Sequence, residues 1–287
     1  MLAELYLRKA KYADPIGAVP QGMEAARQHA AQAAREIKSA RSMATLGMIL
    51  LASERTTKDA ADWFEQARSS DPQIEISYEY TTYLVARGFH QEAIQRSLAA
   101  IAAGHQIKMH SLNLGEIYYI AGQHDKAVGQ LQRARKLYPD SWVPPSLLGL
   151  AALTQRQYLR ASRWFYIGSK VSGSGSRRRL FQDVRGWLGD LMHAKRPAGT
   201  GMERTSTLRG AGIDVLCEAV IALVFGNLAR CLYLLELLAE HEYPTLTWSI
   251  QWPIFEPLRQ DPRYVALRRR LQVPARSSGP LLSHRTS

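Results

Sequence analysis

A repeat with a period of 34 residues constrains the fold of this chain more than any other feature. Two series of small residues recur at this spacing: Gly115 and Gly149, and Ala93, Ala127 and Ala161. A fixed period of about 20 to 50 residues indicates that one supersecondary unit is stacked on copies of itself. We therefore expect the apolar residues to be buried between neighbouring units.

The pattern inside one unit predicts a pair of helices. A Leu-Gly pair comes early, and an alanine, a bulky apolar residue and a second alanine follow at helical spacing. Glycine and alanine fit where two helices cross closely, whereas Leu131 and Phe165 fill the gaps opposite them. Gly122 is expected at the turn, where a positive φ favours glycine, and Pro139 ends the second helix.

This spacing is typical of tetratricopeptide repeats. The expected fold class is all-α, a right-handed superhelical solenoid of antiparallel helix pairs. Residues 1–39 are predicted to form an N-terminal capping helix pair, and residues 40–171 four repeats divided at 73, 108 and 140. Residues 172–211 are a Gly/Ser/Arg-rich break with one helix, residues 212–273 a divergent helix pair with a C-terminal capping motif, and residues 274–287 a disordered tail.

The end of the chain carries a more specific resemblance. The sequence PIFEPLRQDPRYVALRRRL at residues 253–271 resembles the last motif of the tetratricopeptide region in bacterial winged-helix transcriptional regulators of the CadC and HilA kind. The alanine-rich stretch AARQHAAQAAREIK and the segment KDAADWFEQARSSDP are similar to earlier parts of the same region. Related regions occur in some adenylate cyclases and Ser/Thr kinases. In the end motif, Asp261 and Pro262 are expected to start a helix.

The resemblance implies a non-enzymatic interaction or sensing domain of a bacterial transcriptional regulator, with a partner's peptide or helix in its concave groove. Since the given sequence begins without a DNA-binding or catalytic domain, we expect it to be either the sensor half of such a regulator or a domain adopted alone. A standalone scaffold or chaperone, for example one that serves a secretion system, is therefore the alternative. Self-association is a further expectation.

Groove positions also follow from the resemblance, because the first helix of each tetratricopeptide unit lines the concave side. The partner-binding candidates are Tyr78, Thr82, Met109, Leu112, Glu116, Tyr119, Leu150 and Leu153. These positions lack the Lys, Arg and Asn that grip a terminal carboxylate in some co-chaperones. The apolar, aromatic groove suits a partner's amphipathic helix or one of the chain's own terminal helices, and both occupants stay open. Aspartate at Tyr119 or Leu150 is expected to abolish partner capture and leave helicity intact.

The net charge of +12 is the next constraint. Scattered arginines on helices are most often a solvated face, and no winged-helix, zinc-finger or basic-zipper pattern is present. We therefore expect no sequence-specific nucleic-acid binding. Arg177, Arg178 and Arg179 follow SGSGS at a predicted helix start, where the helix dipole disfavours cations. They are the candidate patch for an acidic partner, with a mobile solvated loop as the alternative.

The sequence holds few residues with catalytic or metal-binding spacing. The phosphate-loop, dinucleotide, nucleophile-elbow and zinc-protease motifs are missing, so no catalytic residue, cofactor or metal is expected. His105 and His110 are expected at the surface. Cys217 and Cys231 are expected to be small buried hydrophobes, which suits a reducing compartment and a cytoplasmic location. The longest apolar run, residues 215–226, is too short to span a membrane.

Overall fold

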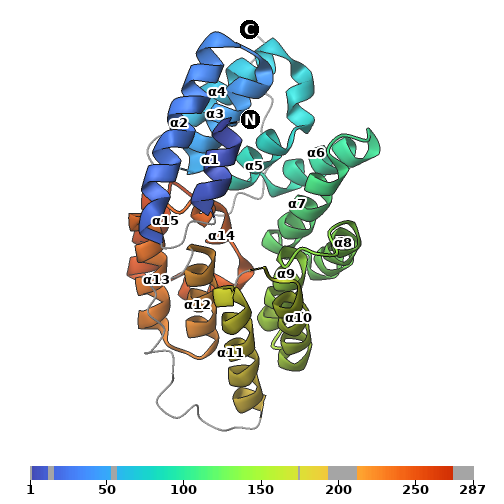
Figure 1. The fold of residues 1–287 in the computed structure, drawn as a ribbon, viewed down its shortest axis with the longest axis vertical. Helices are drawn as coiled ribbons and strands as arrows, with labels where there is room; N and C mark the ends of the chain where they lie inside the picture. Colours follow the sequence, from blue (N-terminus) through green and yellow to red (C-terminus); the bar gives the residue numbers. More distant parts are fainter. Residues whose placement is uncertain (1, 12–15, 53–56, 174, 193–211, 274–287) are drawn as a thin grey trace.

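The computed structural model describes residues 2–11, 16–52, 57–173, 175–192 and 212–273. These residues are helical and contain no strand (Figure 1). The helices of the first part are α1 Leu2–Lys11, η1 Ile16–Ala18, α2 Val19–Glu36, α3 Ala40–Ala52, α4 Thr57–Ser70, η2 Pro72–Ile76, α5 Tyr78–Ala86 and α6 His90–Ala102. Those of the second part are α7 Ile107–Ile120, α8 His124–Leu137, α9 Val143–Thr154, α10 Tyr158–Val171, α11 Gly175–Met192, α12 Gly212–Val224, α13 Leu228–Glu240, α14 Leu246–Ser249, η5 Pro253–Leu258 and α15 Pro262–Arg270.

Helices that follow one another in the chain pack as neighbours. The pairs α3/α4, α5/α6, α7/α8 and α9/α10 coincide with the four predicted units. The first helices of these units also contact one another in succession, α3 with α5, α5 with α7 and α7 with α9. They therefore form one layer, and this layer is the face on which the predicted groove residues lie.

Small residues let the helices of a unit approach closely, as the repeat pattern predicts. A Cβ atom at Gly115 would lie 2.7 Å from Leu131 Cδ2, and one at Gly149 would lie 2.8 Å from the Phe165 ring. Gly122 has a φ of 74°, which confirms the expected turn, and α8 ends two residues before Pro139. Close contacts between the two helices of a unit therefore recur every 34 residues.

The described part of the predicted break after the fourth unit is mostly helical. α11 begins at Gly175 and packs along α10. Phe181 on α11 covers Gly168 and lies 5.7 Å, between ring centroids, from Phe165. α11 thus continues the packing of the array, whereas residues 193–211 of the predicted break, and the tail 274–287, lie outside the described residues.

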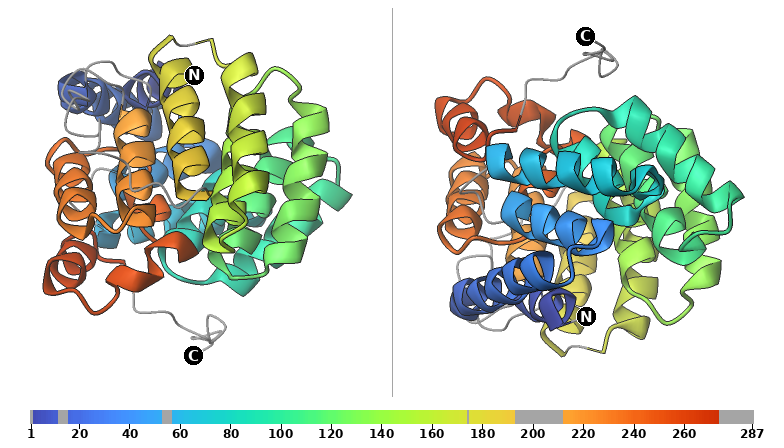
Figure 2. Two further views of the ribbon diagram at one scale, coloured as in Figure 1. Left: turned by 90° about the horizontal axis from the view of Figure 1, so that it is seen from below. Right: turned by 90° about the horizontal axis from the view of Figure 1, so that it is seen from above.

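The C-terminal helices return to the N-terminal ones. Viewed along the long axis, α12 and α13 lie on the same side of the molecule as α1 and α2 (Figure 2), and Arg27 on α2 forms an ion pair of 3.0 Å with Glu242 after α13. Asp261 caps α15 by accepting from the backbone N–H of Arg263 at 2.8 Å, as expected. None of the helices described has the length and hydropathy to cross a membrane.

Candidate binding pocket on the inner face

The chain's own residues 244–258, here called the inner segment, lie against the layer of first helices. Trp252 Nε1 donates to Glu116 Oε1 on α7 at 2.8 Å. Gln251 donates through Nε2 to the Val85 carbonyl on α5 at 3.2 Å, and its Oε1 lies 3.1 Å from His90 Nε2. Helix α14 contacts α3 and α5, while η5 contacts α9. The inner segment thus lies against helices of all four predicted units.

Tyr119 shows how completely the inner segment covers part of the predicted groove. Its side chain is fully buried, its hydroxyl lies 2.7 Å from Thr154 Oγ1, and its ring centroid lies 6.4 Å from that of Trp252. Burial raises the pKa of Tyr119 far above the ordinary tyrosine value. An aspartate here would place a carboxylate in the core, so Tyr119→Asp is expected to destabilise the fold instead of testing partner capture alone.

The inner segment and the helix that follows it are packed as a core. Ile250, Phe255, Leu258 and Tyr264 each expose 1 % or less of their surface, and the Tyr264 hydroxyl donates to the Ile250 carbonyl at 2.6 Å. Exposing one such side chain costs about 1.5 to 3 kcal/mol. A partner helix in the groove would have to displace these side chains, so the inner segment is the groove's resident occupant.

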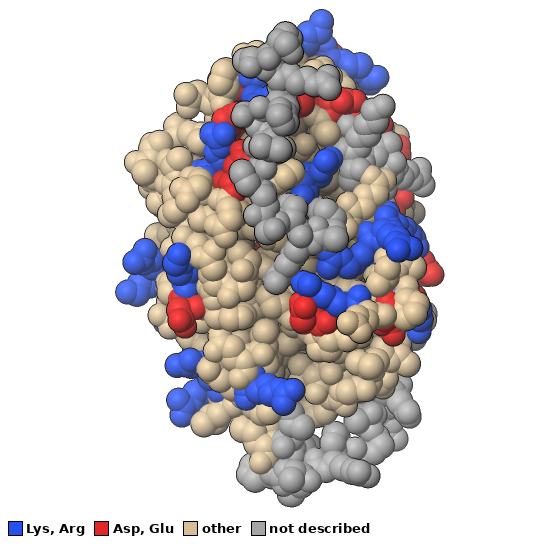
Figure 3. Space-filling view, turned by 180° about the vertical axis from the view of Figure 1, so that it is seen from behind, with Lys and Arg blue, Asp and Glu red and all other residues tan. Residues whose placement is uncertain are grey.

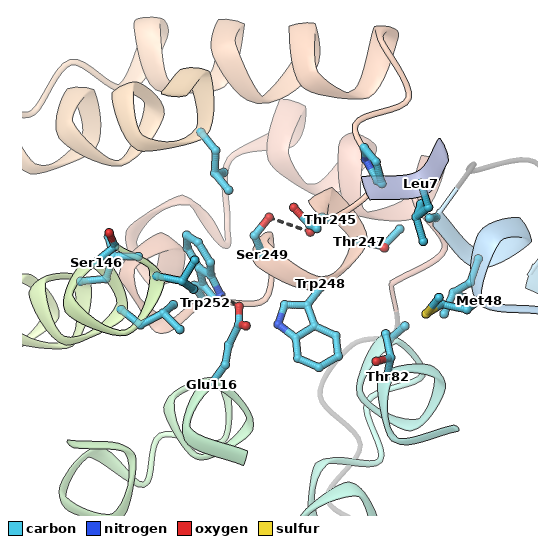
Figure 4. Close-up of a pocket in the computed structure, with 18 of the residues that line it drawn as sticks. Leu7, Met48, Thr82, Glu116, Ser146, Thr245, Thr247, Trp248, Ser249 and Trp252 are labelled. Carbon is cyan, nitrogen blue, oxygen red and sulfur yellow. Dashed lines mark hydrogen bonds between the residues drawn. The ribbon is translucent and has the colours of Figure 1, made fainter. Parts of the chain in front are cut away.

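A pocket remains between the inner segment and the first helices (Figure 4). Its volume is about 180 Å³. The lining residues come from α1, α3, α5, α7, α9, α12 and the inner segment: Leu7, Met48, Leu51, Ala52, Tyr78, Thr82, Ala86, Glu116, Trp142, Val143, Ser146, Leu147, Leu150, Leu216, Cys217, Pro244, Thr245, Thr247, Trp248, Ser249 and Trp252. The pocket is thus built by residues from the beginning, the middle and the end of the chain.

Three hydroxyl groups on the wall of the pocket donate to backbone carbonyls. Thr82 Oγ1 donates to the Tyr78 carbonyl at 2.9 Å, Ser146 Oγ to the Trp142 carbonyl at 2.7 Å, and Ser249 Oγ to the Thr245 carbonyl at 2.8 Å. A hydroxyl that has donated keeps its acceptor lone pairs. Thr82, Ser146 and Ser249 are therefore acceptors toward a molecule in the pocket.

Two tryptophans of the inner segment flank Glu116 and differ in one respect. Trp252 donates to the Glu116 carboxylate, whereas Trp248 Nε1 is buried and has no acceptor within the described part of the chain. Figure 4 shows both indoles beside Glu116. A buried N–H without an acceptor costs roughly 1 to 3 kcal/mol, so Trp248 holds its place through its apolar contacts.

The predicted groove residues divide between pocket, core and surface. Tyr78, Thr82, Glu116 and Leu150 line the pocket. Tyr119 and Leu153 are buried in the core, and Leu112 is half-buried. Met109 is 43 % exposed and belongs to the outer surface.

The structure adds pocket residues that the repeat pattern does not reveal. Thr245, Trp248, Ser249 and Trp252 belong to a segment with neither a repeat period nor a long helix. The available signal was the pair of tryptophans in WSIQW between Pro244 and Pro253, since such large apolar side chains are seldom left exposed.

The three arginines of the predicted acidic-partner patch have different surroundings. Arg177 is buried, forms an ion pair of 3.2 Å with Asp214 and lies over the Trp142 ring at 4.1 Å. Arg178 and Arg179 are exposed, and Arg178 donates to the Ser172 carbonyl at 3.1 Å. Only these two arginines remain accessible to a partner.

Basic side chains elsewhere on the surface form several separate groups. On the face in Figure 3, these groups are interspersed with acidic side chains. Such a distribution is that of a solvated surface, as expected for scattered arginines on helices.

The cysteines lie in apolar surroundings. Burial raises the pKa of Cys217 and that of Cys231 to about 12, so neither thiol is activated as a nucleophile. Among the residues that the structure describes, no group of three His, Cys, Asp or Glu side chains could hold a metal ion.

His110 corrects a surface prediction. His105 is exposed as expected, but His110 is fully buried. Burial lowers its pKa, a weaker backbone interaction with Ile76 opposes the shift, and His105 adds to it. The sequence pattern failed because His110 lies in the first turn of α7, on the side that faces the preceding unit.

No protein-family model matches the chain, and no curated protein matches it. The resemblance to the tetratricopeptide region of such regulators therefore stays a prediction from the sequence.

Proposed function

We propose that this chain is the sensing domain of a bacterial transcriptional regulator, a non-enzymatic tetratricopeptide-like superhelix that responds to a molecule bound in its inner pocket. The proposal rests on one observation: the residues that line the pocket come from distant parts of the chain. Leu7, Met48 and Ala52 come from the N-terminal helices, Glu116 from the middle, and Trp248 from the inner segment. A molecule in the pocket contacts parts of the chain that are more than 200 residues apart.

Because the lining residues come from distant parts of the chain, a bound molecule can affect how these parts are held together. A ligand that contacts all three parts stabilises the closed arrangement in which the inner segment covers the repeats. It changes a regulator only if it binds this arrangement more tightly than another one. The Arg27–Glu242 ion pair between α2 and the C-terminal region marks where the two ends of the described chain meet, and where such a change would alter the surface.

The chemistry of the wall favours binding over catalysis. The hydroxyls of Thr82, Ser146 and Ser249 donate to backbone carbonyls four residues earlier, and so they are not held toward a general base. The Glu116 carboxylate accepts from Trp252 and thereby holds the inner segment. The groove partner expected from sequence is disfavoured because the inner segment already occupies its place.

The test is to fill the pocket in the native gene. Ala86→Leu adds a bulkier apolar side chain from the pocket wall, while Ala99→Leu makes the same change at an exposed position on α6. We expect RNA sequencing to show altered transcript levels for a defined gene set in the Ala86→Leu strain and not in the Ala99→Leu strain. Equal transcript levels in the two strains, with equal protein abundance, would contradict the sensing role.

A standalone scaffold or chaperone is the second candidate, and one observation favours it. Leu98 on α6 and Ile107 and Met109 on α7 are large apolar side chains with 41 to 44 % of their surface exposed. A scaffold would recruit a protein through such an outer surface. Loss of a copurifying protein in a Leu98→Asp/Met109→Asp variant, with unchanged transcripts in the Ala86→Leu strain, would favour the scaffold.

A further inference from the structure

We infer that the inner pocket binds a small, uncharged, predominantly apolar molecule that carries one hydrogen-bond donor, of about the size of a substituted six-membered ring. This inference rests on the proposed sensing function and names the chemical class of its signal. Three properties of the pocket carry it: its volume, the charges on its wall and the direction of its hydroxyl hydrogen bonds.

The volume sets the size of the molecule. The pocket measures about 180 Å³, and an apolar protein cavity of about 150 Å³ is known to hold benzene. A single ring with one or two substituent atoms fits this space, whereas a peptide helix is about 10 Å in diameter and does not. The walls of Trp142, Trp248 and Trp252 offer apolar and aromatic surface to such a ring.

The charges on the wall exclude an anion. No Lys, Arg or His is among the described lining residues, and the one ionisable carboxyl group is that of Glu116. A carboxylate or phosphate would lose its hydration without gaining a cationic partner, and Glu116 would repel it. Glu116 accepts from the Trp252 N–H at 2.8 Å and so anchors the inner segment, and benzylamine tests whether its remaining lone pairs also serve a cationic ligand.

The hydroxyl groups select for a donor. Thr82, Ser146 and Ser249 have each donated to a backbone carbonyl, and they can only accept from a molecule in the pocket. The Trp248 N–H has almost no accessible surface, so it is poorly placed to donate to a molecule in the pocket. These three hydroxyls therefore present acceptors to the pocket, and a ligand with one N–H or O–H group can donate to one of them.

The experiment compares three molecules of nearly equal size on the full chain. Phenol and toluene have the same number of heavy atoms and differ by one hydroxyl donor, and benzoate adds a negative charge. We expect isothermal titration calorimetry to show that phenol binds about tenfold more tightly than toluene, since a net hydrogen bond contributes about 1 kcal/mol or slightly more. Benzoate is expected to bind at least tenfold more weakly than phenol.

Substitutions in the pocket wall test whether phenol binds in the inner pocket. Ala86→Leu and, as an independent variant, Ala52→Leu are expected to abolish phenol binding, while the exposed Ala99→Leu change leaves the dissociation constant unaltered. Both fillers should keep the circular dichroism spectrum of the parent protein. Thr82→Val and Ser249→Ala each remove one acceptor, and at least one of them should reduce the preference for phenol over toluene.

Several results would overturn the inference. Equal affinity for phenol and toluene would remove the donor requirement, and tighter binding of benzoate or of benzylamine would show a charged ligand class. Phenol binding that survives both filling variants would place the molecule elsewhere. The binding measurements and the transcript measurements test different claims. Altered transcripts in the Ala86→Leu strain without phenol binding would refute the ligand class alone. Phenol binding without altered transcripts would refute the regulatory role alone.

Discussion

The indole N–H of Trp252 donates to the carboxylate of Glu116 at 2.8 Å, across a separation of 136 residues in the chain. This bond attaches the inner segment to the third repeat. It also explains why an acidic residue occupies a position otherwise surrounded by apolar groove residues, since a partly buried carboxylate requires donors. The inner segment is thus held by a specific polar contact as well as by apolar burial.

Replacing each tryptophan in turn separates these two contributions. Trp252→Phe removes the donor to Glu116, whereas Trp248→Phe removes a buried N–H that has no acceptor among the described residues. Both changes remove a similar volume, so their difference reports the hydrogen bond. We expect Trp252→Phe to lower the free energy of unfolding by about 1.5 to 3 kcal/mol more than Trp248→Phe, measured by urea denaturation. Equal losses would mean that the Glu116 contact contributes nothing to the inner segment.

The helix pairs could be predicted from sequence because their signal is local. Close helix crossings require small residues, and the turns repeat a positive φ at Gly88, Gly122 and Arg156, so a period of 34 residues records the geometry directly. The helices of all four units, and the cap at Asp261, lie within a few residues of the predicted bounds.

The pocket could not be predicted in the same way. It depends on how residues 244–252 fold back on helices that lie far away in the sequence, and no period links Trp252 to Glu116. The repeat register identified one wall, including Tyr78, Thr82 and Glu116. The opposite wall and the burial of Tyr119 follow from the tertiary position of the inner segment.

The close crossing at Gly149 can be tested against a matched glycine. Alanine at Gly149 would press its Cβ against the Phe165 ring, while Gly129 on α8 has no atom within 4 Å of an added Cβ. We expect Gly149→Ala to destabilise the protein by about 1 to 3 kcal/mol despite its better helix propensity. Gly129→Ala should be stabilising by up to about 1 kcal/mol. The measurement is thermal unfolding, and stabilisation by both changes would show that the helices of the fourth unit do not cross as closely as described.

Because His110 is buried, we expect the free energy of unfolding to fall in mild acid. Its pKa is lowered by burial in the folded protein and takes its ordinary value in the unfolded chain. Below about pH 6.5 the unfolded chain therefore binds a proton that the folded protein binds more weakly, so the free energy of unfolding falls as the pH falls. The slope due to this group is at most about 1.4 kcal/mol per pH unit.

Urea denaturation at a series of pH values measures this slope. The slope below about pH 6.5 should decrease in His110→Leu and persist in His105→Gln, because His105 is exposed. A slope that is unchanged in His110→Leu would assign the acid sensitivity to other groups.

Among the arginines that follow SGSGS, we expect removal of the charge of the buried Arg177 to destabilise the protein most. Arg177 pairs with Asp214 at 3.2 Å, and both side chains are about nine-tenths buried, whereas Arg179 is exposed. Removing one partner of a buried ion pair leaves the other charge uncompensated, so Arg177→Met should lower the free energy of unfolding by about 3 to 5 kcal/mol. Because Arg179 is exposed, Arg179→Met should lower it by less than about 0.5 kcal/mol. The double variant Arg177→Met/Asp214→Leu should recover part of the loss in a double-mutant cycle followed by urea denaturation. A similar small effect of all three changes would return Arg177 to the accessible surface and restore the three-arginine patch as a site for an acidic partner.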